Sequence, residues 1–231
     1  MPVGINAVTT GSGTETSVSP DRTVSHTVAG SNVFMVAGIS WSANNAGITI
    51  DNVTYNGVNM FVIAQLVNGS INNELWALAN PAAGTHNLVA TWLLSVGDIV
   101  QDVIGVITFT GAASNSAASQ ATGSDTAPTV NITGVSTNNM ILDHLAVFPA
   151  DNAPTVTVGA DQTQRWNLQA GTAVGGTRTV GAGSTEPGLV GVATMSWSLD
   201  VGDPWAIQAI EILTASTLKD PVQHGVVAFA R

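Results

Sequence analysis

Four histidines and fifteen acidic residues are the groups in this chain that could carry acid–base chemistry. His144 lies beside Asp143 within an apolar run. Neighbouring side chains of a strand point to opposite faces. Asp143 and His144 therefore cannot form the acid–base pair that activates a nucleophile. The Gly-x-Ser-x-Gly, His-Glu-x-x-His and Gly-x-x-x-x-Gly-Lys motifs are all missing from the sequence. We therefore predict that the protein is not an enzyme and that it uses no cofactor.

The carboxylates could also serve a glycosidase or bind calcium. Glu74 and Glu211 alternate with apolar neighbours, which predicts that both point outward from half-buried strands. Aspartates in the turns at 98–102 and 200–203 carry the oxygen ligands that calcium prefers. Aspartate after glycine is also ordinary turn chemistry, so the sequence leaves the metal question open.

Six tryptophans accompany a single tyrosine. Five of them lie in or beside apolar runs, where core packing is the default. Trp166 differs because it follows Arg165 in the polar stretch 161–167. An exposed tryptophan beside an arginine can stack on a sugar or anchor an interface. Arg165 and Trp166 are therefore candidate interface or glycan contacts, the alternative being that Trp166 caps the core as one more strand residue.

The charge balance excludes several partners. The chain has 5 basic and 15 acidic residues, a net charge of −10, and its few cations are scattered. A phosphate backbone needs a clustered positive surface, so we expect no binding to nucleic acid or to anionic membranes. There is no cysteine for a disulfide or a thiolate zinc site. We also expect no classical signal peptide and no membrane-spanning run.

Short runs of apolar and β-branched residues recur along the chain, each bounded by Gly, Asn, Asp, Pro or Ser. This pattern is typical of strands in an all-β protein. Asn56-Gly57 between two such runs is a strong hairpin signal. The predicted strands are 22–28, 33–41, 48–55, 60–67, 73–79, 86–94, 103–109, 129–132, 140–148, 155–158, 164–168, 190–199 and 205–213.

The sequence contains a weak internal repeat. Trp92, followed by Val-Gly-Asp at 96–98, is matched by Trp197, followed by Val-Gly-Asp at 201–203. We predict one two-layer antiparallel β-sandwich, jelly-roll-like, with pseudo-halves 22–110 and 127–215 joined by a low-complexity crossover. Two tandem Ig-like sandwiches are the alternative. We favour a single sandwich because the second half lacks a clear counterpart of the hairpin at 55–67 and so looks incomplete as a free-standing domain.

Several segments resemble a loosely defined class of β-sandwich domains found in phage structural proteins and in bacterial surface or secreted proteins. The likeness covers residues 23–213 and consists of core and turn residues. The segments are VTYNGV at 53–58, ELWALANP at 74–81, QTQRW at 162–166, and MSW at 195–197 with DPWA at 203–206. The resemblance implies a sandwich fold and a structural or adhesive setting, with no transferable site.

Residues 1–21 and 216–231 are predicted to be terminal arms that flank the sandwich domain at 22–215. Val226, Val227 and Phe229 form an apolar, strand-prone stretch in the second arm. An apolar tail is unfavourable in water, so these residues are candidate contacts with a sheet edge of the same or a neighbouring subunit.

These observations predict a non-enzymatic structural virion protein, such as a phage capsid decoration or cement protein. The expected partners are further copies of the chain in a homo-oligomer and other virion proteins. The alternative is a glycan-binding module or adhesin of a bacterial surface or secreted protein, located outside the cell and binding carbohydrate.

Overall fold

The computed structural model describes residues 1–149, 154–171 and 177–215, and every regular element within them is a β-strand. The prediction of an all-β, antiparallel sandwich fold is confirmed. The strands of the first half are β1 (Gly4–Thr16), β2 (Asp21–Val28), β3 (Val33–Ala43), β4 (Thr49–Tyr55), β5 (Val58–Asn59), β6 (Phe61–Asn68), β7 (Ile71–Ala79), β8 (Gly84–Leu93) and β9 (Ile99–Thr110). Those of the second half are β10 (Ala112–Asn115), β11 (Ser119–Gly123), β12 (Thr129–Val135), β13 (Met140–Val147), β14 (Val156–Val158), β15 (Thr163–Ala170), β16 (Thr179–Pro187), β17 (Gly191–Leu199) and β18 (Trp205–Thr214).

The first half is a two-layer sandwich with the strand order of a jelly roll. A sheet in the order β1-β9-β3-β7-β6 faces a sheet in the order β2-β8-β4-β5. Alternate residues of each strand point between the sheets, where Met35, Ile39, Tyr55, Leu88 and Trp92 form the centre of the core.

The second half repeats this order. Its sheet β10-β18-β13-β16-β15 faces β12-β17-β14, and β11 also pairs with β18. The tryptophans of the repeat are equivalent, because the backbone N of Trp92 donates to Pro20 O (3.0 Å) and that of Trp197 to Pro128 O (2.9 Å). Both indoles lie in the core of their own sandwich. The chain therefore holds two jelly-roll sandwiches in place of the single two-layer sandwich predicted. Strands β14 and β15 follow β13 as β4 and β6 follow β3, but they lie in different sheets and do not pair with each other.

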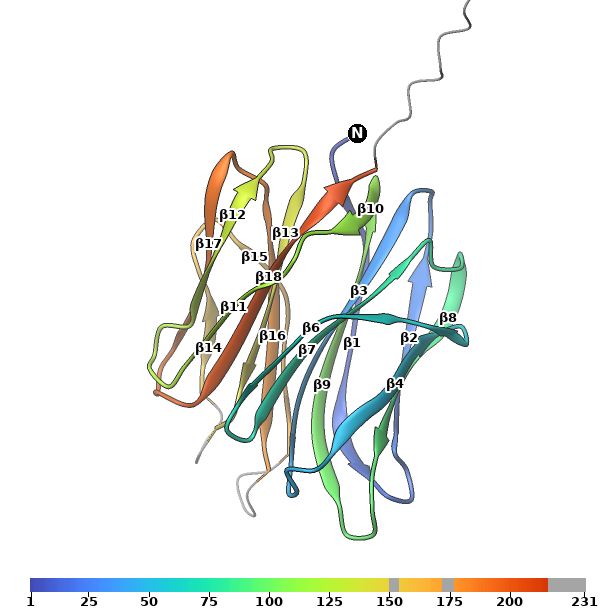
Figure 1. Cartoon of the computed structure of the whole chain (residues 1–231), viewed down its shortest axis with the longest axis vertical. Helices are drawn as coiled ribbons and strands as arrows, with labels where there is room; N and C mark the ends of the chain where they lie inside the picture. The colour runs from blue at the N-terminus through green and yellow to red at the C-terminus, as the bar shows by residue number, and fades with distance from the viewer. Residues whose placement is uncertain (150–153, 172–176, 216–231) are drawn as a thin grey trace, which may run out of the picture.

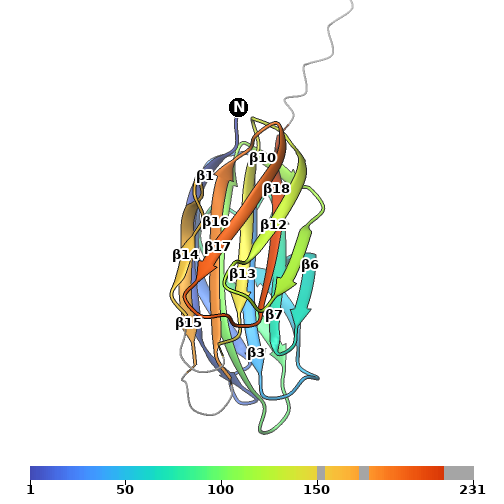
Figure 2. The same ribbon diagram turned by 90° about the vertical axis from the view of Figure 1, so that its left-hand side faces the viewer.

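The two sandwiches stack face to face, so that four sheets lie in layers (Figure 1). Figure 2 turns the second sandwich toward the viewer, with the strands of both halves running along the long axis. A third core lies between the facing sheets and includes Phe34, Leu75, Phe109, Leu142 and Ile210. Burial of these side chains joins the halves into one unit.

Polar side chains continue this interface beyond its apolar part. Asn73 Nδ2 donates to the backbone O of His144 and of Ala206, each at 2.8 Å. Gln208 Nε2 donates to Asn73 Oδ1 (3.0 Å), and Ser40 Oγ lies 3.0 Å from His144 Nε2 in a further hydrogen bond. Satisfied polar groups of this kind fix the relative position of the packed sheets.

Three segments differ from the sequence-based expectations. Most of the segment predicted as an N-terminal arm is β1, which pairs with β9 from Gly4 to Thr16. The low-complexity crossover forms β10 and β11, which pair with β18. Strand β16 was not predicted because it is rich in Gly, Ser and Thr, yet it lies between β13 and β15. Residues 216–231, with Val226, Val227 and Phe229, lie outside the described part of the chain.

Candidate functional site

Trp166 is buried between the two sandwiches, which corrects the expectation of an exposed ring. Its exposure is 3%, and it belongs to the apolar cluster between the facing sheets. A Cβ added at Gly105 or Gly183 would overlap the Trp166 ring, so these glycines leave the space that the ring fills. The ring lies 5.8 Å from that of His144 between centroids. Trp166 is therefore no surface for stacking a sugar.

Arg165 remains partly exposed at a bulge between β15 and β16. Its Nε donates to Thr185 Oγ1 at 2.7 Å. The sequence contains a signal for this arrangement, because the apolar residues Trp166, Leu168 and Ala170 alternate with polar ones. That alternation places the tryptophan on the inward face and the arginine on the outward one.

The aspartates considered as calcium ligands do not form a metal site within the part of the chain that the structure describes. Asp98 accepts hydrogen bonds from the backbone N of Ser95 (2.8 Å) and from Asn45 Nδ2 (3.2 Å). Asp102 accepts from Arg22 Nε at 3.0 Å, and the same guanidinium pairs with Glu15. Among the described residues, no group of three or more His, Asp or Glu side chains could hold a metal ion.

Glu74 is buried, in contrast to the outward position predicted for it and for Glu211, which is also buried. The Glu74 carboxylate accepts hydrogen bonds from Trp41 Nε1 (3.2 Å), Trp76 Nε1 (2.9 Å) and Gln65 Nε2 (3.1 Å). Burial raises the pKa of Glu74, and the three donors act in the opposite direction. Both carboxylate oxygens are thus occupied within the fold.

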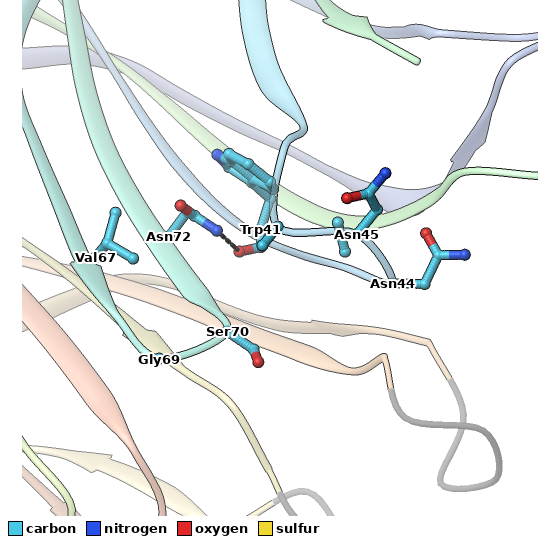
Figure 3. A pocket seen from close by; sticks show the side chains of 9 residues that line it. Trp41, Asn44, Asn45, Val67, Gly69, Ser70 and Asn72 are labelled. Atoms are coloured by element: carbon cyan, nitrogen blue, oxygen red, sulfur yellow. Dashed lines mark hydrogen bonds between the residues drawn. The ribbon is translucent and has the colours of Figure 1, made fainter. Parts of the chain in front are cut away.

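A pocket of about 350 Å³ opens beside this cluster, between the loop after β3 and the turn after β6 (Figure 3). An adjoining hollow of about 280 Å³ shares Trp41, Val67 and Asn72 with it and extends to Glu74. The pocket is lined mostly by neutral polar and small side chains. The lining residues of the larger hollow are Trp41, Ala43, Asn44, Asn45, Ala46, Val67, Gly69, Ser70 and Asn72.

The loop wall of the pocket is tied to the turn before β9. Asn44 Nδ2 donates to Gly97 O, and Asn44 Oδ1 accepts from Ile99 N, each at 2.9 Å. Asn45 Oδ1 accepts from Gly47 N at 3.1 Å. The pocket joins residues that are far apart in sequence and carry no motif, so sequence reasoning missed it.

Strand β6 forms a second surface feature at the edge of its sheet. Among the described strands its single sheet neighbour is β7, and it contains neither a charged residue nor a proline. Phe61 is 48%, Val62 42% and Val67 59% exposed. Gln120 Nε2 of β11 donates to Gln65 O (3.2 Å) and covers part of the strand toward its C-terminal end.

Within the described chain there is no helix with the length and hydropathy of a membrane span. The fold and its surface define an all-β protein of two stacked jelly-roll sandwiches, with one polar pocket and one bare sheet edge as its candidate sites. Comparison with protein-family models, with curated proteins and with solved structures found no match to the chain.

Proposed function

We propose that this protein is a non-enzymatic structural subunit of a larger assembly, in which copies of the chain meet at β6. A phage virion, with the chain as a decoration or cement component, is the setting that the resemblance of its core and turn segments implies. The single observation that carries the proposal is the bare apolar edge of β6. Soluble proteins usually protect sheet edges with charges, prolines or a covering segment.

The chemistry of the edge favours a protein neighbour. Phe61 and Val62 are large, apolar and exposed, and lie on a strand whose outer side pairs with no strand that the structure describes. The chain as a whole carries a net charge of −10, which keeps copies apart. An uncharged edge strand that also exposes large apolar side chains, as β6 does, is where two copies can approach with least repulsion and pair their backbones.

The buried acidic clusters fit a structural protein as well. Asp143 is 0% exposed and Glu74 is 4% exposed, and both carboxylates accept hydrogen bonds from side chains of the fold. A catalytic acid must reach the atom that it protonates. Asp143 is closed to solvent, and both oxygens of Glu74 already accept hydrogen bonds within the fold.

The test is the solution mass of the full chain, measured by light scattering after size-exclusion chromatography over a range of concentrations. We expect the wild type to form oligomers and Val62→Lys to shift it toward the monomer. Thr133→Lys, on the exposed face of the described edge strand β12, is the matched control and should leave the mass unchanged. A wild type that stays monomeric throughout, or a Val62→Lys variant with wild-type mass, would overturn the proposal.

A further inference from the structure

We propose that the pocket between the loop after β3 and the turn after β6 binds a neutral saccharide. This inference is independent of the assembly proposal, because it concerns the pocket alone. It also differs from the sequence-based glycan hypothesis, which rested on Trp166.

The hydrogen-bonding groups of the pocket divide into anchored and available ones. Asn44 and Asn45 use their amides to hold the loop, which gives the pocket a fixed wall. Ser70 Oγ makes no hydrogen bond to any residue that the structure describes, and Asn72 makes one long bond, from Nδ2 to Trp41 O at 3.5 Å. Asn72 Oδ1 and Ser70 Oγ are therefore free to bind a ligand, and Figure 3 shows both residues at the pocket.

The charge of the lining indicates a neutral ligand. None of the described residues that line either hollow is Lys, Arg or His, so the described lining has no cation to attract a phosphate or a carboxylate. The one acidic residue is Glu74, and its oxygens already accept from Trp41, Trp76 and Gln65. These three bonds use most of its acceptor positions, and one carboxylate does not supply the several oxygen ligands that a cation needs.

The remaining lining is apolar and suits the C–H faces of a sugar ring. Val67 is 59% exposed, and the buried Trp41 lines both hollows. A ligand with both hydroxyl groups and C–H faces matches amide and hydroxyl groups set among small apolar ones. The volume of about 350 Å³ lies at the small end of the range for ligand pockets, which indicates a monosaccharide or a disaccharide unit.

The experiment follows the backbone and asparagine side-chain amide signals of the full ¹⁵N-labelled chain by NMR. Glucose, galactose, mannose, N-acetylglucosamine and their disaccharides are added singly to tens of millimolar, with sialic acid and glucose 6-phosphate as acidic probes. We expect at least one neutral sugar to shift the signals of Asn44, Asn45 and Asn72 in a saturable way. Asn72→Ala and Ser70→Ala should each weaken that binding by about tenfold, because each removes one ligand hydrogen bond.

Asn131→Ala, which removes an exposed amide on β12, is the matched control and should bind as the wild type does. Three results would overturn the inference. They are the absence of saturable shifts with every neutral probe, equal or tighter binding of the acidic probes, and wild-type affinity in both pocket variants. The assembly proposal is tested by the solution mass, which does not depend on these NMR results. Either proposal can therefore fail while the other holds.

Discussion

The two sandwiches each bury a carboxylate under the same kinds of donor but differ in what lies beside it. In both, a tryptophan indole N–H and a glutamine side-chain amide donate to the carboxylate. In the first sandwich Glu74 accepts from Trp41, Trp76 and Gln65. In the second, Asp143 accepts from Trp197 and Gln162. Glu74 borders the surface pocket, whereas Asp143 is completely enclosed and accepts two further bonds from Ser184.

This difference shows that two copies of one fold can use the same kind of buried carboxylate in different surroundings. A buried carboxylate is costly unless its hydrogen bonds are made. The first sandwich meets that requirement with side chains, and the second adds the backbone N of Ser184. In the second sandwich the result is a closed core. In the first, the carboxylate accepts a hydrogen bond from Trp41, and Trp41 lines a pocket that is open to solvent.

The largest effect is expected for the paired core tryptophans. Trp92→Ala and Trp197→Ala should each lower the free energy of unfolding by about 3–5 kcal/mol, because both indoles fill the centre of a sandwich. Urea denaturation of each variant measures the loss. An unchanged midpoint in either variant would contradict the equivalence of the two halves.

The next effect tests whether the two halves are one unit. Gly183→Ala should cost about 1–3 kcal/mol, because the added methyl group overlaps the Trp166 ring that packs against the first sandwich. Combining it with Trp166→Leu should cost less than the sum of the single changes, since the smaller side chain leaves room. Strict additivity in thermal or urea unfolding would show that the ring does not lie against this glycine.

Sequence patterns predicted the strands whose apolar residues alternate or cluster, such as β3 and β13. They missed β1 and β16, because strands rich in Gly, Ser and Thr look like loops. In β16 the small residues have a structural reason, since Gly183 makes room for Trp166 across the sheet. Nothing local to β16 could reveal a requirement imposed by another strand.

The candidate sites were predicted less well than the fold. The inward direction of Trp166 could be read from its alternation with Leu168 and Ala170, but a polar neighbourhood suggested exposure. The pocket combines residues near 41–46 and 67–72, which only the folded chain brings together. The bare edge of β6 depends on strand order, which hydrophobic patterning does not determine.

A smaller difference in unfolding free energy is expected between phenylalanine variants of the two tryptophans of the repeat. Trp197 Nε1 donates to Asp143 Oδ2 at 2.7 Å, whereas Trp92 Nε1 has no partner among the described residues. Trp197→Phe should therefore cost about 1 kcal/mol more than Trp92→Phe, since it removes a hydrogen bond to a buried carboxylate. Equal losses in urea unfolding would contradict a stabilising role for this hydrogen bond.

The smallest effect is a pH dependence of the melting temperature. Burial raises the pKa of Asp143 and of Glu15 to about 7 and that of Asp102 to about 6. Their contribution is fully present below the unfolded-state pKa, near 4, and is lost as pH rises through about 6 to 7. Burial lowers the pKa of His26 and His144 to about 4, so their contribution is lost as pH falls from about 6.5 toward 4.

Between pH 6.5 and 8 Asp143 and Glu15 lose their stabilising contribution, and this loss exceeds the remaining gain from the two histidines. We therefore expect the melting temperature to fall over this interval. Asp143→Asn removes one of these groups and should make that fall shallower. Scanning calorimetry of both proteins at matched ionic strength measures the slopes. A wild-type melting temperature that is constant or rises over this interval would contradict the assignment.

The central claim is that β6 is an assembly surface, and amide hydrogen exchange tests it most directly. Exchange of residues 61–68 is followed by mass spectrometry at low and high concentrations of the full chain, with the β12 edge as internal reference. We predict that the β6 peptides exchange more slowly at high concentration, that β12 does not change, and that Val62→Lys abolishes the difference. Exchange of β6 that is the same at both concentrations would contradict the account.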